Sequence, residues 1–233
     1  MPVSGIDRPG NYSNGVITKY STQVLHLMKK TFRPVLLFML MGSMLAYAQS
    51  NTEVYTTIRP AQPTQAAAGK VEVVEIFFYG CIHCYHYEPY LEKWLQNKPA
   101  NAEFRRMPVV FQKNQTPLAK AYYTAEKLGI LNKIHHSLFE AINRDGRNIF
   151  EDEAIKAFFI EQGVNADDFS RIYNSMEVTT KVRQAEVMVR NYRVPGTPAL
   201  VVNGKYLTSP SMAGSYDVLV QTLNSLIAKE SGG

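Results

Sequence analysis

The sequence of 233 residues has only two cysteines, Cys81 and Cys84, and they are separated by just two residues. A disulfide stabilises a fold mainly by closing a loop, and the stabilisation grows with the length of that loop. A bridge across two residues constrains the unfolded chain very little. The scarcity and spacing of the cysteines therefore argue against a structural disulfide and indicate a pair kept for its chemistry.

No apolar run in the chain reaches the length of about 20 residues that a membrane-spanning helix needs. The run Val35–Leu45 has 11 residues, follows a basic segment that starts at Met28, and precedes the small residues Ala46 and Ala48. A basic segment, a short apolar run and a small-x-small site are typical of a secretory signal peptide. We therefore predict that residues 28–48 form a signal peptide cleaved after Ala48.

Positive charge is also scarcer than the formal net charge of +5 implies. Residues 1–48 carry five lysines and arginines and one acid, so the rest of the chain has 20 basic and 19 acidic residues. A nearly neutral exported part gives no support for nucleic-acid binding. Residues 1–27 are polar and lack periodicity. We interpret them as a stretch upstream of a true start at Met28, or as a disordered extension.

Low-complexity segments and internal repeats are lacking, which argues against a repeat fold, and a hydrophobic content of 45% suffices for a core. Residues 49–69 combine prolines, alanines and polar residues and are expected to be a flexible lead-in. Val71–Phe78 is β-branched and aromatic and predicts a buried strand. A helix over 85–96 and a second strand over 102–110 follow. This order predicts parallel strands joined by a right-handed crossover.

The region from about residue 113 to residue 178 has helical patterns and no strand pattern. Helices are expected over residues 116–128, 132–143, 151–162, 167–175 and 178–192. Beyond them, two apolar segments flank Asn203-Gly204, a strong signal for a two-residue hairpin, and residues 215–229 have the spacing of an amphipathic helix. The sequence thus predicts an α/β domain formed by residues 49–112 and 179–233, which carries an all-helical insertion over 113–178.

The motif Cys81-Ile82-His83-Cys84 follows the first predicted strand and opens a helix, which is the context of a redox-active cysteine pair. At a helix N-terminus, free N–H groups and the helix dipole stabilise a thiolate on Cys81. Cys84, one turn further on, is expected to be more buried and to resolve the mixed disulfide. The imidazole of His83 can donate to the Cys81 thiolate or attract it. Stabilising the reduced form in this way makes the disulfide a stronger oxidant.

Metal binding is the competing interpretation of the same motif. Four potential zinc ligands lie within six residues: Cys81, His83, Cys84 and His86. A tetrahedral zinc site usually combines two separated ligand pairs, and the sequence has no second cluster. His135 and His136 are distant and are expected on a helix surface. Haem attachment requires histidine directly after the second cysteine, where Tyr85 stands. We therefore expect no metal.

A second motif, Val194-Pro195-Gly196-Thr197-Pro198-Ala199, precedes the strand of the predicted hairpin. Proline cannot donate to a sheet ladder and belongs at a strand start or edge. Cis peptide bonds occur almost only before proline, in tight turns. Thr197–Pro198 in the cis form can present its backbone to an extended substrate, whereas a trans proline would merely end the loop. The residues alone leave both forms open.

The chain from Val71 to the C-terminal helix resembles the DsbA family of thiol:disulfide interchange proteins. The resemblance is carried by EIFFYGCIHCYHYEPYL, by TPALVVNGKY and by the helical block between them. It implies a thioredoxin fold with an inserted helical domain, a periplasmic location and oxidation of thiols in newly exported proteins. It further implies a monomer with a redox-active disulfide and no other cofactor, and reoxidation by a quinone-linked inner-membrane partner of the DsbB type.

The resemblance also implies roles for the residues of both motifs. Cys81 is the nucleophile, Cys84 resolves the mixed disulfide, and Thr197–Pro198, with Pro198 cis, faces the disulfide. A substrate groove is expected there, with Tyr79, Ile82 and Tyr85 as apolar neighbours and with backbone pairing that gives breadth rather than selectivity. The best-known members have proline where this chain has Ile82, which leaves the oxidising strength open.

Three charged residues occupy places that the family gives to a proton relay. Glu75 stands in the first predicted strand, where burial raises the pKa of a carboxyl towards the working range, so that it can exchange a proton with Cys84. Glu88 and Arg106 fall where the family has a nearby acid–base pair. For these two, a surface role is an equally good interpretation.

Two other functions compete with disulfide donation. Disulfide isomerases and reductases of the same superfamily usually carry an N-terminal dimerisation module, and the roughly 20 residues between Ala48 and the first strand are too few for one. A non-catalytic chaperone or binding module would not need Cys81, His83, Cys84 and Pro198 together. We therefore predict a periplasmic thiol:disulfide oxidoreductase.

Overall fold

The computed structural model describes residues 53–232. The predicted N-terminal extension over 1–27 and the signal peptide over 28–48 lie outside the described residues. Between residues 53 and 232, no helix combines the length and the apolar character that crossing a membrane requires.

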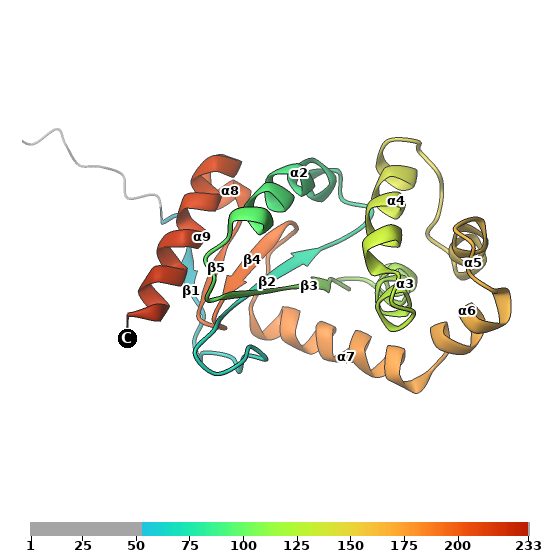
Figure 1. The fold of residues 1–233 in the computed structure, drawn as a ribbon, viewed down its shortest axis with the longest axis horizontal. Helices are drawn as coiled ribbons and strands as arrows, with labels where there is room; N and C mark the ends of the chain where they lie inside the picture. Colours follow the sequence, from blue (N-terminus) through green and yellow to red (C-terminus); the bar gives the residue numbers. More distant parts are fainter. Residues whose placement is uncertain (1–52, 233) are drawn as a thin grey trace, which may run out of the picture. The chain divides into compact units, whose positions relative to one another are not determined.

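A five-stranded mixed sheet with the strand order β1-β5-β4-β2-β3 lies at the centre of the fold (Figure 1). Its strands are β1 (Thr56–Thr57), β2 (Val71–Phe77), β3 (Ala102–Pro108), β4 (Ala199–Val202) and β5 (Tyr206–Thr208). Helix α2 (Ile82–Asn97) joins the parallel strands β2 and β3, while β4 runs antiparallel to β2 and β5. The predicted strands and crossover are confirmed. All seven residues of β2 are buried, as expected of a central strand.

The predicted hairpin between β4 and β5 is also confirmed. Asn203 and Gly204 have φ angles of 51° and 63°, and Lys205 donates its N–H to the carbonyl of Val202 at 3.0 Å. Positive φ at both central residues is what a type I′ turn requires, and asparagine and glycine adopt it most readily. The turn sets the register of β4 against β5, in which Val202 pairs with Tyr206.

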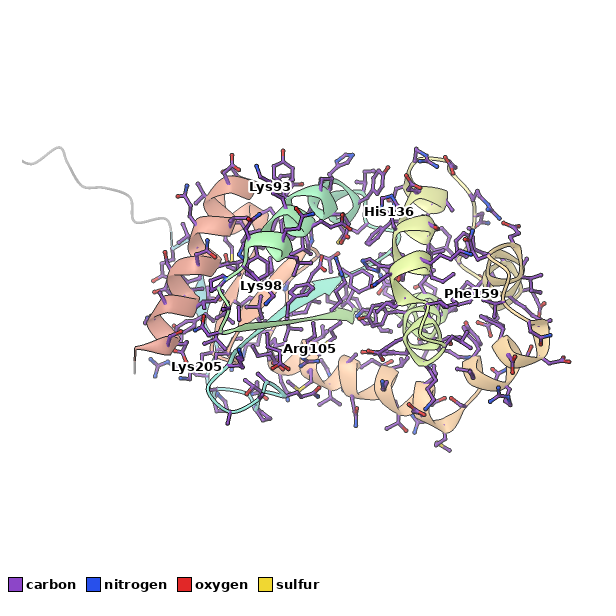
Figure 2. All side chains as sticks on the ribbon, in the orientation of Figure 1. Lys93, Lys98, Arg105, His136, Phe159 and Lys205 are labelled. Atoms are coloured by element: carbon purple, nitrogen blue, oxygen red, sulfur yellow. The ribbon has the colours of Figure 1, made fainter. Side chains whose placement is uncertain are left out.

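A 3-10 helix, η1 (Lys113–Gln115), and five α-helices separate β3 from β4 in the chain. The α-helices are α3 (Thr116–Lys127), α4 (Leu131–Asn143), α5 (Asp152–Glu161), α6 (Ala166–Tyr173) and α7 (Met176–Asn191). Each matches a predicted helix, and Gly129 and Gly163, both with positive φ, follow α3 and α5. The fully buried Phe159 lies among these helices (Figure 2). Helix α7 is continuous across residue 178, where the sequence analysis places the end of the insertion.

Helices cover both faces of the sheet (Figure 1). One apolar cluster joins the face of Val73, Leu200 and Val202 to α2 and α9 (Tyr216–Ser231), the C-terminal helix expected from the sequence. A short helix, α8 (Pro210–Ala213), precedes α9 and was not expected. A second cluster joins the opposite face to α7 and to the interior of the helical block. The sheet is therefore fixed on both sides, which holds the end of β2 and the start of α2 in a rigid frame.

The expectation of a flexible lead-in over residues 49–69 is wrong for its described part. Strand β1 pairs with β5, Ile58 is buried, and the hydroxyl of Thr208 donates to the carbonyl of Val54 at 2.6 Å. Backbone pairing with a strand far along the chain orders this segment. A two-residue strand has too little side-chain periodicity to be recognised in the sequence.

Candidate functional site

The C-x-x-C motif lies at the N-terminus of α2. Cys81 has extended backbone angles and caps the helix, and its carbonyl accepts the N–H of Tyr85 at 3.1 Å. The Cys81 side chain is half-buried, whereas Cys84 is fully buried one turn later. The predicted context of both cysteines is thus confirmed: one thiol faces the surface at the positive end of a helix, and the other lies beneath it.

The Thr197–Pro198 loop meets this motif from a distant part of the chain. The peptide bond before Pro198 is cis, which confirms the form that the resemblance implied. In the thiol form, Cys81 Sγ–H donates to the carbonyl oxygen of Thr197 at 3.3 Å. An incoming chain that donates a hydrogen bond to this carbonyl is therefore held beside Cys81.

Several donors converge on Cys81 Sγ and lower the pKa of the thiol to about 5. The largest contribution is a hydrogen bond from the Cys84 thiol. Partial burial opposes it, and the Thr197 side chain and the N–H groups of Cys84 and His83 add to it. Hydrogen bonds to the charged form favour ionisation, so Cys81 is a thiolate at neutral pH. His83 contributes through its backbone, and the predicted role of its exposed imidazole stays a prediction.

Cys84 has the opposite environment. Burial raises the pKa of its thiol well above the ordinary value, and the neighbouring Cys81 and the charge of Glu75 raise it further. A group held as a thiol while its partner is a thiolate gives the pair two distinct chemical roles. Whenever Cys84 leaves a disulfide, a proton has to reach it.

A buried acid–base cluster lies beneath the cysteines. Arg106 donates from Nε to Glu75 at 2.9 Å and from Nη2 to Glu88 at 3.1 Å. Glu75 is fully buried and Glu88 is 4% exposed, so the surface interpretation of Glu88 and Arg106 is wrong. Burial raises the pKa of Glu75 to about 8, with Glu88 adding to the rise and Arg106 opposing it. The pairing depends on the register that sets Glu75 opposite Arg106, which residue type and local periodicity do not specify.

The expectation that His135 lies on a helix surface is also wrong. Its side chain is buried on α4, where Nδ1 lies 2.9 Å from the Tyr79 hydroxyl and Nε2 lies 3.5 Å from Glu88 Oε1. The helical spacing of the sequence could have indicated that His135 is buried, since it stands four residues before Phe139 on the apolar side of α4. Its neighbour His136 is exposed (Figure 2).

The four potential zinc ligands of the competing interpretation do not form one cluster. Cys84 points into the core, while His83 and His86 are exposed. Among the described residues, no group of three or more histidine, cysteine or acidic side chains is arranged to hold a metal ion.

A groove of about 460 Å³ opens beside the cysteines, lined by His83, Pro195, Gly196, Thr197, Pro198, Ser209, Pro210, Ser211 and Tyr216. Ile82 is 42% exposed next to it. Tyr79, which the sequence analysis placed on this surface, is buried instead and packs its ring on Phe77 and Phe139. The exposed apolar surface near Cys81 therefore comes from Ile82 and the proline loop.

Gly80, directly before Cys81, lies against two aromatic rings. A Cβ atom added there would lie 2.7 Å from Cε1 of Phe78 and 2.9 Å from Cε1 of Phe150. We expect Gly80→Ala to lower the free energy of unfolding by about 1–3 kcal/mol, since the rings have to move in a packed site. Urea unfolding measures this. Gly196→Ala is the matched control, because nothing lies within 4 Å of its added Cβ; equal losses in both variants would contradict the steric explanation.

Comparisons with known proteins agree with this geometry. A model of the DSBA-like thioredoxin domain family matches residues 72–224. The thiol:disulfide interchange protein DsbA of Burkholderia cepacia is 35% identical over 204 residues, 86% of this chain and 96% of the relative. The crystal structure of Pseudomonas aeruginosa DsbA has a TM-score of 0.73 and 32% identity over 77% of this chain and 93% of that one. For Xylella fastidiosa DsbA the TM-score is 0.71, with 31% identity over 77% and 96%.

Fold, cysteine environment and similarities agree on the class: the molecule is a thiol:disulfide oxidoreductase with a thioredoxin fold and a helical insertion, as the sequence predicted. Its reactive group is a pair of cysteines. Within that class, the chain belongs to the DsbA family.

Proposed function

We propose that this enzyme is exported to the periplasm, after cleavage behind Ala48, and donates the Cys81–Cys84 disulfide to newly exported proteins with free thiols. The observation that carries the proposal is the place of Cys81 at the N-terminus of α2, above the buried Cys84 and beside the cis Pro198 loop, where the pKa of its thiol is lowered to about 5. A thiolate that is stable at neutral pH stabilises the reduced enzyme, which makes the disulfide a stronger oxidant. Electrons then flow from substrate thiols to the enzyme.

The first step is an attack of a substrate thiolate on Cys81 Sγ. The Cys81–Cys84 bond breaks, and Cys84 leaves with the electron pair. Since the pKa of Cys84 is raised, the leaving sulfur needs a proton, and Glu75, with a pKa of about 8, holds one at neutral pH. We assign Glu75 as the proton donor, with Glu88 and Arg106 as the pair that tunes it. A second substrate thiolate then attacks the substrate sulfur and releases Cys81 as a thiolate.

Substrate is proposed to bind along the groove beside the cysteines. Thr197 offers its backbone and Pro198 shapes the loop, while Ile82 supplies exposed apolar contact. Backbone pairing reads no particular side chains, so an enzyme of this design accepts many unfolded chains. His83 stands at the edge of the groove, where its imidazole can contact the thiolate.

Regeneration completes the proposed cycle. The reduced Cys81 thiolate attacks a disulfide of a quinone-linked inner-membrane partner of the DsbB type, and Cys84 then displaces that partner, so the chain needs no external cofactor. We also infer that the thioredoxin-like domain comprises residues 49–112 and 179–233 and the helical insertion 113–178, and that the enzyme acts as a monomer.

The proposal is tested by the reduction potential of the cysteine pair together with the pKa of Cys81. We expect Cys81 to titrate near pH 5, followed by thiolate absorbance. We expect a reduction potential of about −120 mV, which is the value for DsbA, and not the value of about −270 mV found for thioredoxin. Equilibration with glutathione measures it. A thioredoxin-like potential would mean that Ile82 in the dipeptide shifts the enzyme towards reduction or isomerisation, which is the alternative function.

A further inference from the structure

Helix α4 of the helical insertion reaches the buried acid cluster through one side chain. His135 is 5% exposed, and the rings of Phe77, Tyr122 and Phe139 surround it. Its two ring nitrogens lie 2.9 Å from the Tyr79 hydroxyl and 3.5 Å from Glu88 Oε1. A histidine from the insertion thus lies between a tyrosine that precedes the cysteines and a carboxylate of α2.

These contacts determine which nitrogen carries the proton. Burial lowers the pKa of His135, so the ring is neutral near pH 7, and burial raises that of Tyr79, so the phenol keeps its proton. If Nδ1 carried the ring proton, the lone pair of Nε2 would face the negative Glu88 carboxylate, and the two would repel each other. The favourable arrangement has the Tyr79 hydroxyl donating to Nδ1 and the Nε2–H pointing at Glu88. Asn143, on the same helix, donates to the Tyr79 carbonyl at 2.8 Å and holds that residue in place.

The two carboxyl groups of the cluster compete for one guanidinium. Arg106 donates once to Glu75 and once to Glu88, and Glu88 faces His135 in addition. Burial opposes ionisation of Glu88, but the His135 ring, whose Nε2 lies 3.5 Å from Glu88 Oε1, and the charge of Arg106 outweigh it and lower the pKa of Glu88. Two carboxylates near one cation cannot both stay charged in a buried site. The group with fewer donors takes the proton, and that group is Glu75.

We propose that His135 is a positioning residue of the exchange reaction: by pointing its Nε2–H at Glu88 Oε1, 3.5 Å away, where neither atom has another partner, it keeps that carboxylate charged and leaves the shared proton on Glu75, which passes it to Cys84. The proposal rests on the function proposed above, in which Glu75 protonates Cys84 as that sulfur leaves the Cys81–Cys84 bond with the electron pair. Glu75 then regains a proton from water. Without the His135 donor, the proton can move to Glu88, and Cys84 leaves beside a charged Glu75.

The titratable groups that face this cluster come from every element packed on it. Around His135 they are Glu88 of α2, Arg106 of β3, Tyr79 before α2, Tyr122 of α3 and His136 of α4. Around Glu75 they also include Cys84 and Tyr87 of α2. Apart from Glu88 and Glu75 themselves, none of these groups is an acid that ionises below neutral pH. The proton shared by the two glutamates is therefore the one that His135 can direct.

The test is a pH titration of both glutamates by NMR with carbon-13 in their carboxyl groups, assigned with Glu75→Gln and Glu88→Gln. In the unaltered protein we expect Glu75 to titrate near pH 8 and Glu88 to stay charged throughout that range. In His135→Leu we expect the proton affinity of Glu88 to rise at least tenfold and that of Glu75 to fall. Oxidation of a thiol peptide at pH 7 should slow about tenfold, within the range of acid catalysis.

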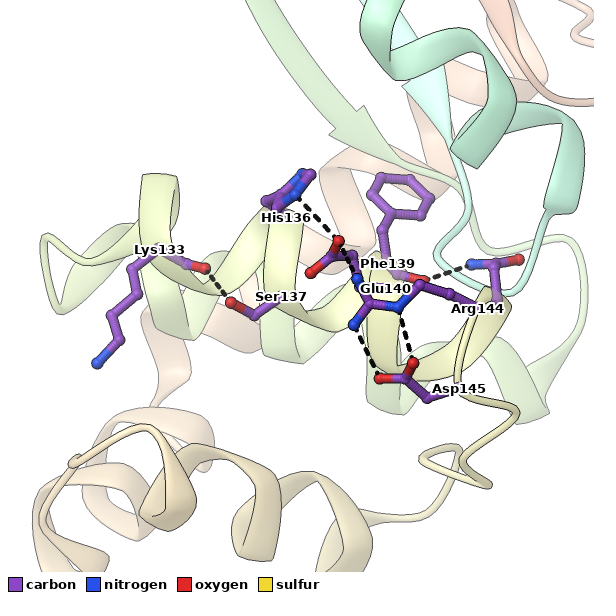
Figure 3. A network of polar contacts seen from close by, with 8 residues as sticks. Lys133, His136, Ser137, Phe139, Glu140, Arg144 and Asp145 are labelled. Carbon is purple, nitrogen blue, oxygen red and sulfur yellow. Dashed lines mark hydrogen bonds and ion pairs between the residues drawn. The ribbon is translucent and has the colours of Figure 1, made fainter.

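His136→Leu is the matched control: its side chain is 60% exposed and pairs with Glu140 (Figure 3), so it acts on Glu88 only through space and its loss should move the titration of Glu88 far less. His135→Gln should restore much of the effect, since its amide can donate to Glu88. If His135→Leu does not fold, Tyr79→Phe keeps the ring and removes only the hydroxyl that fixes the tautomer, and the same shift is expected. Unchanged titration curves in either variant would overturn the proposal. If Glu75 does not titrate near pH 8 in the unaltered protein, the relay itself fails instead.

Discussion

Cys81→Ser will lose thiol exchange by roughly a thousandfold or more, since a serine hydroxyl is not ionised at neutral pH and cannot form a disulfide. This sulfur lies at the N-terminus of α2, 3.3 Å from the Thr197 carbonyl, and hydrogen bonding there lowers the pKa of its thiol to about 5. A serine in the same place keeps the fold but offers neither a leaving group nor a bond to the substrate. Oxidative refolding of a reduced, unfolded protein measures the loss.

Cys84→Ser is the paired variant, because it keeps the Cys81 thiolate and removes the resolving thiol. We expect it to lack oxidase activity as well but to accumulate mixed disulfides when a disulfide-containing peptide is added, visible on a non-reducing gel. The Cys81 thiolate attacks one sulfur of the peptide disulfide, the other sulfur leaves as a thiolate, and no Cys84 thiol remains to resolve the product. Cys81→Ser should form none. If Cys81→Ser still promoted folding at more than a few per cent of the original rate, the non-catalytic chaperone would become the better explanation.

Arg106→Met will lower the free energy of unfolding by about 3–5 kcal/mol, the usual cost of leaving a buried charge without its partner. The arginine serves two buried carboxyl groups, Glu75 and Glu88, through separate nitrogens. Methionine fills a similar volume and donates nothing. Urea unfolding at several pH values measures both the size of the loss and its pH dependence.

The pH dependence has a definite sign. A carboxyl whose pKa is higher in the folded than in the unfolded protein favours folding at low pH, and this contribution is lost as the pH rises through the folded value. Glu75 already behaves in this way, with a folded pKa of about 8. Without Arg106, the pKa of Glu88 is raised in the folded protein as well. The difference in the free energy of unfolding between Arg106→Met and the original protein should therefore widen from about pH 4.5 to pH 8.

Arg105→Met is the matched control for this experiment. Arg105 is the neighbouring residue of β3 (Figure 2), and its Nε donates at 2.9 Å to Glu72, which is buried on the other face of the sheet. Its loss also removes a buried ion pair but leaves the surroundings of Cys84 intact. We expect both variants to lose stability and only Arg106→Met to slow thiol exchange. Equal kinetics in the two variants would count against a relay through Glu75 and Glu88.

The sequence predicted those parts of the site that depend on local order. A strand of β-branched and aromatic residues, a break at Tyr79-Gly80 and a cysteine at the start of a helix determine where Cys81 and Cys84 lie. The Asn203-Gly204 turn was equally readable, since its conformation depends on two adjacent residues. In each case the information lies within a few consecutive positions.

Contacts between distant segments could not be read in the same way. For Glu88 and Arg106 the sequence left a role beside the active site and a surface role equally open, because each is ordinary in its own helix or strand. The β2–β3 register sets Arg106 opposite Glu75, and the same guanidinium also binds Glu88 of α2. His135 is a partial exception, since its spacing from Phe139 places it on the apolar side of α4, but only the packing of α4 against α2 brings its ring to Glu88. These side chains differ from solvent-exposed ones through their contacts with residues that are distant in the sequence, and not through their residue type.

The pairing of β1 with β5 has a consequence for the order in which this molecule is built. Val54 and Thr208, which share a hydrogen bond, are 154 residues apart in the chain. A ribosome makes the first of them early and the second late, so the sheet edge stays open for most of synthesis, and such distant contacts slow folding. Open edges invite pairing with other chains. This enzyme has no structural disulfide to hold its segments together, so its five-stranded sheet is complete only after β5 has been made.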